Sequence, residues 1–242
     1  MFRTILFCVA AILTVVIIGL PVMLIILLVR LFSKRAARSM TYGFVRFVMR
    51  VFMPISGTKI TLVGKENIPD KHTPVLFVSN HRSYFDIITA YVAIPGHYGF
   101  IGKKEFKKVP MMAQWMQLLG CIFLDRENPR EGIRSINAAV DYIKDGYSIW
   151  ICPEGTRSHL DKRLPFKEGS FKIAEKAGCP IVPVAFVHTD DILENHMPKL
   201  KPANVTLVVG APIETAGLSR QEMRSLHQQV YDQIQEMYEK YV

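Results

Sequence analysis

The stretch Val75-Leu76-Phe77-Val78-Ser79-Asn80-His81-Arg82-Ser83-Tyr84-Phe85-Asp86 joins an apolar run to a polar turn. Its first four residues are apolar, and three of them are β-branched or aromatic, which predicts a buried strand. A helix is expected after the turn, over residues 87–92. The stretch therefore predicts His81 at the carboxyl end of a strand, where open α/β sheets bind their ligands.

Asp86 follows His81 by five residues, about one helical turn, which brings its carboxylate within reach of the imidazole. A carboxylate bonded to one ring nitrogen fixes the tautomer and leaves the other nitrogen as a base. The same spacing also occurs where a surface histidine lies beside a helix N-cap. The pattern alone leaves both interpretations open.

Composition and charge narrow the class of protein. The 242 residues suffice for one domain with a proper core, and half of them are hydrophobic. The net charge is +9, but residues 1–64 hold eight Lys or Arg and no acidic residue, whereas the remaining 22 basic residues face 21 acidic ones. Because the basic excess lies beside the most apolar segment, anionic lipid is the expected partner, and nucleic acid is not.

The cysteines and histidines show no metal-binding or disulfide pattern. Cys8, Cys121, Cys152 and Cys179 include no Cys-x-x-Cys spacing, which predicts neither a disulfide framework nor a zinc site. The seven histidines form no ligand-like cluster in the sequence. No metal is expected.

Residues 4–29 are uncharged and overwhelmingly aliphatic. As a helix they could cross a hydrocarbon core about 30 Å thick. The run is too long for a signal peptide and lacks a small-x-small cleavage site. Basic residues between positions 34 and 38 place that end in the cytoplasm. Gly19 and Pro21 interrupt the run, so a kinked or re-entrant helix competes with a span.

A second helix is expected over residues 42–52, with Arg46 and Arg50 on one face. It fits an amphipathic helix lying at the membrane interface. A core helix with two arginines reaching for solvent is the alternative. Residues 1–56 are accordingly predicted to anchor the protein to a membrane, and residues 57–242 to form one α/β domain with flanking helices.

Strands and helices alternate along this second part. Strands are expected at 59–63, 74–79, 98–101, 121–124, 148–152, 181–187 and 205–209. Helices are expected at 110–119, 133–143 and 170–176, and after a capping box at 219–222. Residues 111–116, rich in Met, fit either an acyl-chain groove or an ordinary core helix.

Polar residues follow several of these strands. After the strand at 148–152, Glu154 supplies a carboxylate, Gly155 a free backbone turn and Arg157 a planar fork suited to phosphate. Lys103 and Lys104 follow another strand, and Arg126 ends a third. A solvated charge at a strand end is commonplace, but the convergence of four such ends, including the His81 loop, favours a site.

In four motifs the sequence resembles the glycerolipid acyltransferases, specifically the 1-acyl-sn-glycerol-3-phosphate acyltransferases. Three of the motifs are Asn-His-x-x-x-x-Asp at residues 80–86, Gly-x-x-Phe-x-x-Arg at 120–126 and Pro-Glu-Gly-Thr-Arg-Ser at 153–158. The fourth is an apolar stretch around Pro183. Cys152 stands where the family usually has Phe. The resemblance covers residues 58–210.

The resemblance implies a mixed-sheet acyltransferase domain behind a membrane-associated helical segment. It implies transfer of an acyl group from acyl-CoA or acyl carrier protein to the sn-2 hydroxyl of a lysophospholipid, 1-acyl-sn-glycerol-3-phosphate, giving phosphatidic acid. The thioester is a co-substrate, and no cofactor is expected. The implied location is the inner membrane, with the active site on its cytoplasmic face.

The resemblance also implies roles for residues. His81 would be the general base and Asp86 its orienting partner. The substrate-binding residues would be those around the acceptor phosphate and glycerol: Arg157, Glu154, Gly155, Thr156, Lys103, Lys104 and Arg126. Cys152 could in principle carry the acyl group as a nucleophile, but direct transfer is predicted.

Three alternatives remain at this stage. The acceptor could be another lysolipid, such as lyso-ornithine lipid or lysophosphatidylglycerol. A membrane-bound acyl-thioester hydrolase would leave Arg157 and the lysines without a role. A non-catalytic lipid-binding protein would not need both His81 and Asp86.

Overall fold

The computed structural model describes residues 1–70, 72–125, 127–158 and 164–242. Within these ranges the chain forms one seven-stranded sheet in the order β1-β7-β6-β2-β5-β3-β4. The strands are β1 (Lys59–Val63), β2 (Leu76–Ser79), β3 (Tyr98–Lys103), β4 (Ile122–Leu124), β5 (Ser148–Ile151), β6 (Ile181–Val187) and β7 (Asn204–Val209).

The sheet is mixed, as expected. β2 pairs in parallel with both β5 and β6, and β3 pairs in parallel with β5 and β4. β7 runs antiparallel to β6, and β1 runs parallel to β7. The carboxyl ends of β2, β3, β4, β5 and β6 therefore meet at one edge of the sheet, with β2 in the middle.

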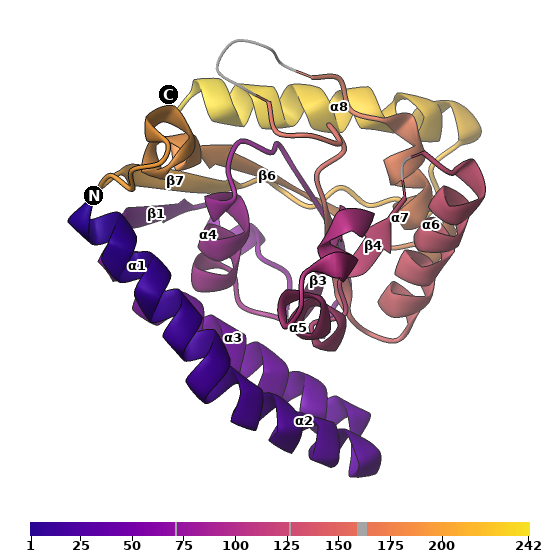
Figure 1. Ribbon diagram of the computed structural model, residues 1–242. Coiled ribbons are helices and arrows are strands. Elements are labelled where there is room, and N and C mark those ends of the chain that lie inside the picture. Colours follow the sequence, from indigo (N-terminus) through magenta and orange to yellow (C-terminus); the bar gives the residue numbers. More distant parts are fainter. Residues whose placement is uncertain (71, 126, 159–163) are drawn as a thin grey trace.

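Helices cover both faces of the sheet (Figure 1). On one face lie α3 (Lys34–Ser56), α4 (Phe85–Ala93) and α5 (Met112–Leu118), and on the other lie α6 (Pro129–Lys144), α7 (Lys172–Ala177) and α8 (Arg220–Glu239). β2 shows why both faces are covered: Val75, just before the strand, and Phe77 join one core cluster, whereas Leu76 and Val78 join the other. Alternate residues of a strand point to opposite faces, so an unbroken apolar strand requires two cores.

The N-terminal segment is one long helix with a distortion in the middle. α1 (Phe2–Leu13) continues through a π-helical turn, Thr14–Gly19, into α2 (Leu20–Phe32). Pro21, which has no backbone N–H, follows the π-helical turn. The helix Phe2–Phe32 is long and apolar enough to cross a membrane, and most of its apolar side chains are exposed. This supports membrane association.

α3 runs back alongside α2 (Figure 1) and is longer than expected. The Ser33 side chain caps it by accepting from the Ala36 N–H at 3.2 Å, and Gly57, at φ 77°, ends it. Tyr42 is buried in the core, and Arg46 Nε donates to the Tyr91 carbonyl oxygen at 3.1 Å. This face of α3 is a core face, as the alternative interpretation of this helix held.

Several predicted boundaries shift by a residue or two. β5 ends at Ile151, so Cys152 lies beyond the strand that was expected to contain it. β3 extends to Lys103. Trp115 of α5 is buried and stacks on Phe44, with ring centroids 5.0 Å apart, so it belongs to a core helix. The capping box at Ser219 and Glu222 is present as predicted.

Candidate active site

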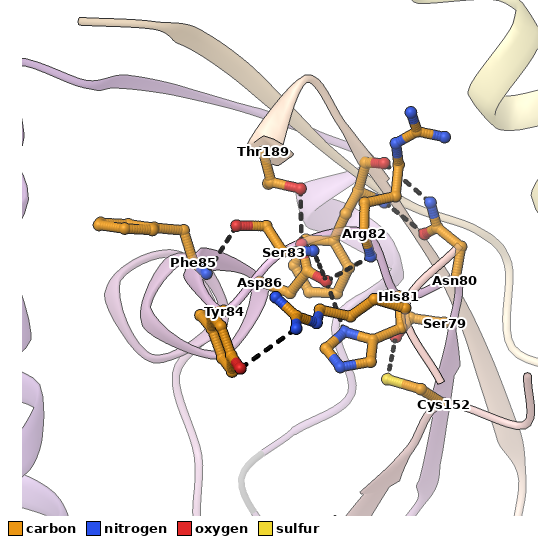
Figure 2. A network of polar contacts seen from close by, with 12 residues as sticks. Ser79, Asn80, His81, Arg82, Ser83, Tyr84, Phe85, Asp86, Cys152 and Thr189 are labelled. Atoms are coloured by element: carbon orange, nitrogen blue, oxygen red, sulfur yellow. Dashed lines mark hydrogen bonds and ion pairs between the residues drawn. The ribbon is translucent and has the colours of Figure 1, made fainter. Parts of the chain in front are cut away.

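His81 and Asp86 form the pair that the sequence predicted. His81 lies two residues beyond β2, and its Nδ1 is 2.8 Å from Asp86 Oδ2 (Figure 2). The Asp86 side chain is 1% exposed and that of His81 23%. With Nδ1 donating to the carboxylate, the neutral imidazole keeps its lone pair on Nε2. The ring can therefore accept a proton at Nε2.

Asp86 is fixed by three further donors. Its Oδ2 accepts the backbone N–H of Arg82 at 2.8 Å and of Ser83 at 2.9 Å. Its Oδ1 accepts the Thr189 hydroxyl at 2.5 Å (Figure 2). These donors fix the direction in which the carboxylate faces the imidazole of His81. The orienting carboxylate is thus held rigidly.

Residues 80–86, which hold both candidate catalytic residues and are called the catalytic loop below, are tied at their start to the neighbouring strand β6. Asn80 Nδ2 donates to the Phe186 carbonyl at 2.9 Å, and Asn80 Oδ1 accepts the Phe186 N–H at 2.8 Å. The Asn80 side chain thereby continues the sheet pairing one step past the end of β2. This explains why an asparagine precedes the histidine.

The loop after β5 holds the backbone of His81. Glu154 Oε1 accepts the His81 N–H at 3.2 Å, and the Ser158 N–H donates to the His81 carbonyl at 2.8 Å. Gly155 adopts φ 80°, which favours glycine, while its N–H donates to the Cys152 carbonyl at 3.1 Å. The two loops therefore form one unit.

Glu154 is buried, with 7% of its surface exposed. Burial raises the pKa of its carboxyl group from the ordinary 4.5 to about 7. Oε2 is also buried and has no hydrogen-bond partner among the described residues. An unpaired buried carboxylate oxygen is costly, so Oε2 is available to a hydroxyl or an amide of a ligand.

Arg157 lies against Tyr84 of the catalytic loop. Its guanidinium carbon is 3.8 Å from the Tyr84 ring centroid, and Nη2 donates to the Tyr84 hydroxyl at 3.1 Å. Nη1 donates to Glu194 Oε1 at 3.1 Å. Arg157 thus reaches the His81 loop as predicted, but a carboxylate of this chain already occupies part of its fork.

Three residues of the site were missed at the sequence level: Thr189, Asp190 and Glu194. They follow β6, whose carboxyl end lies beside that of β2. Asp190 Oδ2 accepts from Arg82 Nη2 at 2.7 Å and from Nε at 3.2 Å. The polar run after the buried strand was the available signal, because it repeats the pattern found after β2 and β5.

The other predicted substrate-binding residues are Lys103, Lys104, Thr156 and Arg126, and no hydrogen bond between the described ones and the catalytic loop is seen. Lys104 pairs with Glu127 at 2.9 Å and Asp125 at 3.0 Å, and these hydrogen bonds raise its pKa. Lys103 and Thr156 are exposed. Arg126 lies outside the described residues. Among the described members of the whole predicted substrate-binding set, only Glu154 and Arg157 are hydrogen-bonded to the catalytic loop.

A largely apolar pocket of about 220 Å³ lies at the carboxyl ends of β3, β4 and β5. Ile101, Leu124 and Ile151 line it from the strands, and Ile136 and Ile173 from α6 and α7. Cys152 and Gly155 also line it, so it adjoins the loop that holds His81. The pocket suits a hydrocarbon or thioester group.

Cys152 is half-buried and belongs to this lining. Its Sγ is 3.4 Å from Ser79 Oγ (Figure 2), which accepts the Trp150 Nε1–H at 2.8 Å. Cys152 therefore lies just beyond β5 and not inside the strand expected at 148–152, and it both packs against the core cluster that contains Phe77 and Trp150 and lines the pocket.

Fold and site together define an α/β protein in which a carboxylate-oriented histidine can take a proton from a hydroxyl group. The chain belongs to the Acyltransferase family, whose family model matches residues 59–187. The matched range includes β1 to β6 and the whole catalytic loop.

Relatives and a solved structure carry names of one activity. A chloroplastic 1-acyl-sn-glycerol-3-phosphate acyltransferase of Brassica napus is 34% identical over 64% of this chain and 45% of that protein. A probable 1-acyl-sn-glycerol-3-phosphate acyltransferase of Mycoplasma pneumoniae is 27% identical over 92% of this chain and 90% of that protein. The crystal structure of the 1-acyl-sn-glycerophosphate acyltransferase PlsC of Thermotoga maritima matches with a TM-score of 0.84 and 25% identity, covering 99% of this chain and 96% of that one. The chain spans about half the length of several curated relatives that it matches.

Proposed function

We propose that this protein transfers a fatty acyl group from an acyl thioester to the sn-2 hydroxyl of 1-acyl-sn-glycerol-3-phosphate, giving phosphatidic acid. The observation that carries the proposal is the His81–Asp86 pair, 2.8 Å apart, at the carboxyl end of β2. The names of the relatives support the choice of acceptor. The protein is an O-acyltransferase in this proposal.

The acceptor hydroxyl attacks the thioester carbonyl while His81 Nε2 takes its proton. A tetrahedral intermediate forms, the carbon–sulfur bond breaks, and the imidazolium returns the proton to the departing thiol. Because a thioester is already activated, no nucleophile of the protein is required. Asp86 keeps the proton of neutral His81 on Nδ1 and stabilises the imidazolium.

The acceptor headgroup is held by the loop after β5 in this proposal. Among the described residues, Tyr84 and Glu194 take two of the five N–H donors of Arg157, and the other three are enough for a phosphate. Glu154 Oε2, buried and unpaired among the described residues, positions the glycerol. Lys103, the exposed last residue of β3, adds positive charge at the same edge of the sheet. Lys104 and Arg126 are kept as phosphate contacts in this proposal on the strength of the resemblance alone.

The acyl donor, acyl-CoA or acyl carrier protein, places its thioester end in the pocket at the ends of β3, β4 and β5. Support comes from its largely apolar lining and from its contact with Gly155, the neighbour of Glu154. The thioester is a substrate, and the proposed chemistry uses no cofactor.

The proposed location is the cytoplasmic face of the inner membrane. The apolar helix Phe2–Phe32 supplies the membrane contact. Exposed Lys34 and Arg35 follow it and favour the cytoplasmic side.

An acyl-transfer assay in detergent micelles tests the proposal. Wild-type protein is supplied with acyl-CoA and, separately, acyl carrier protein thioester, over a panel of lysolipid acceptors. Lysophosphatidic acid is expected to give the highest kcat/KM, with little free fatty acid released when no acceptor is present. Preference for another lysolipid would change the acceptor, and acceptor-independent release of fatty acid would identify a hydrolase.

A further inference from the structure

Glu194 is a buried carboxylate that the four sequence motifs do not include. It begins the 3-10 turn Glu194–His196, and its side chain is 2% exposed. Oε2 accepts the Ser83 hydroxyl at 2.6 Å, and Oε1 accepts the Tyr84 N–H at 2.8 Å. Oε1 also accepts from Arg157 Nη1 at 3.1 Å. One carboxylate thus joins the catalytic loop to the loop after β5.

The orientation of Arg157 is set by these contacts. The Glu194 carboxylate binds one end of the guanidinium, and the Tyr84 hydroxyl binds the other. The face of the Tyr84 ring, 3.8 Å from the guanidinium carbon, fixes its plane. The side chain remains 25% exposed. The N–H groups of Arg157 that bond none of the described residues are therefore held in a fixed direction.

The catalytic loop is held from two sides by two carboxylates. Asp86 accepts the N–H groups of Arg82 and Ser83, and Glu194 accepts the N–H of Tyr84 and the hydroxyl of Ser83. Asp86 also bonds His81, whereas Glu194 also bonds Arg157. The base and the arginine are therefore linked through the same few backbone groups.

We propose that Glu194 is a positioning residue that orients Arg157 toward the acceptor phosphate and fixes its place relative to His81. This inference rests on the proposed function. Glu194 orients the Arg157 guanidinium by accepting a hydrogen bond from it, as Asp86 orients the His81 imidazole. The consequence is that acceptors are selected by the spacing between their hydroxyl and their phosphate, because neither protein group can shift alone.

Glu194→Gln tests the inference with little change of shape. The amide oxygen still accepts a hydrogen bond, and the amide N–H can donate to the Ser83 hydroxyl, but the charge that holds Arg157 is lost. We expect the KM for lysophosphatidic acid to rise about tenfold, because a misdirected Arg157 loses one hydrogen bond to the charged phosphate. The KM for the acyl thioester should stay within about twofold. Glu131→Gln, which removes the carboxylate paired with Arg134 on the surface of α6, is the matched control and should change neither value.

A double-mutant cycle with Arg157→Ala separates positioning from a structural role. If Glu194 acts through Arg157, adding Glu194→Gln to Arg157→Ala should not raise the acceptor KM further. Glu194→Asp, which keeps the charge but shortens the side chain, serves where the glutamine variant fails to fold, and the same cycle applies to it. The inference would be overturned if the fold-changes in acceptor KM of the two single variants multiplied in the double variant. It would also be overturned if Glu194→Gln raised the KM for lysophosphatidic acid and the KM for the acyl thioester equally. A wild-type protein that does not acylate lysophosphatidic acid would instead overturn the proposed function together with this inference.

Discussion

At the scale of single residues, the Asp86 carboxylate accepts four hydrogen bonds, three on Oδ2 and one on Oδ1. Oδ2 faces His81 Nδ1 and the N–H groups of Arg82 and Ser83. An asparagine would have to turn its NH2 either toward these donors or toward Thr189. In the first orientation the NH2 group cannot accept a hydrogen bond from His81 Nδ1–H, and the imidazole shifts to the wrong tautomer. In the second orientation the tautomer is kept, but the negative charge that stabilises the imidazolium is lost.

We therefore expect Asp86→Asn to lower the transfer rate about 10²- to 10⁴-fold, the usual range for loss of a general base. The measurement is the initial rate with saturating acceptor and donor, and far-UV circular dichroism checks that the variant is folded. Activity within tenfold of wild type would mean that His81 does not need its carboxylate.

Glu154 gives a stability prediction with a definite sign. Its pKa is raised to about 7 by burial, so between pH 4.5 and 7 the folded protein binds a proton that the unfolded chain has lost. Stability from this group is full below pH 4.5 and falls as the pH rises toward 7. In the Glu154→Gln variant, the side chain at this position does not titrate between pH 4.5 and 7. Between pH 5 and pH 8, we expect the wild type to lose stability relative to this variant. The difference between their free energies of unfolding should change by on the order of 3 kcal/mol at most.

Denaturant unfolding of both proteins at several pH values measures this difference. A difference that does not change with pH would mean that the Glu154 carboxyl titrates in the folded protein as it does in the unfolded chain.

Cys152 lines the pocket, so a covalent acyl-cysteine has to be tested directly. Ser79 Oγ contacts its sulfur, and Trp150 Nε1 in turn donates to that hydroxyl, which favours a packing role. We predict direct transfer in a ternary complex, with Cys152→Ser and Cys152→Phe keeping most of the activity. Initial-rate plots against both substrates should intersect. Parallel lines, or acylated Cys152 found by mass spectrometry without acceptor, would contradict direct transfer.

At the scale of elements, α2 presents opposite faces to the protein and to its surroundings. Met23 and Ile26 are buried, whereas Leu24 and Leu28, four residues apart, are exposed. Two leucines leaving a membrane cost about 1.5–3 kcal/mol each. Leu24→Glu combined with Leu28→Glu should therefore lower binding to anionic vesicles more than tenfold without changing Tm. The matched control is Ile133→Glu on α6, also an exposed apolar residue. An equal loss of binding in the control would show that another surface meets the membrane.

The elements themselves were largely predictable, because their signals are local. The apolar runs of β2 and β6, the left-handed Gly57 and Gly178 after α3 and α7, and the Ser219 capping box all act within a few residues. The early start of α3 was missed, although Ser33 is an ordinary N-cap. Strand order and the antiparallel pairing of β6 with β7 were not predictable, because they depend on contacts between distant segments.

The site was predictable only in part, for the same reason. The spacing of His81 and Asp86 within one turn is local, and the structure places the two side chains in contact. Thr189, Asp190 and Glu194 lie more than a hundred residues further along, and they reach the catalytic loop only because β6 pairs with β2. Ion pairing of Lys104 with Asp125 and Glu127 was likewise hidden from the sequence.

At the scale of the whole molecule, the sheet brings His81, Arg157 and the pocket to one edge. His81 follows β2, and Glu154 and Arg157 follow β5. Thr189 and Glu194 follow β6 and bond Asp86 and Arg157, respectively. The membrane-associated helix α1–α2 packs on α3, which shares a core with the sheet. The membrane-associated helices and the sheet that carries the candidate site therefore pack together as one unit, to which a lipid acceptor and a thioester donor can both bind.

Formation of phosphatidic acid by wild type and by His81→Ala tests the central claim most directly. Both proteins, purified in the same detergent and matched by Tm, are given lysophosphatidic acid and acyl thioester, and the product is quantified by mass spectrometry. Wild type should form phosphatidic acid, and His81→Ala should form it about 10²- to 10⁴-fold more slowly. Equal rates from the two proteins, or no phosphatidic acid from wild type, would contradict the account.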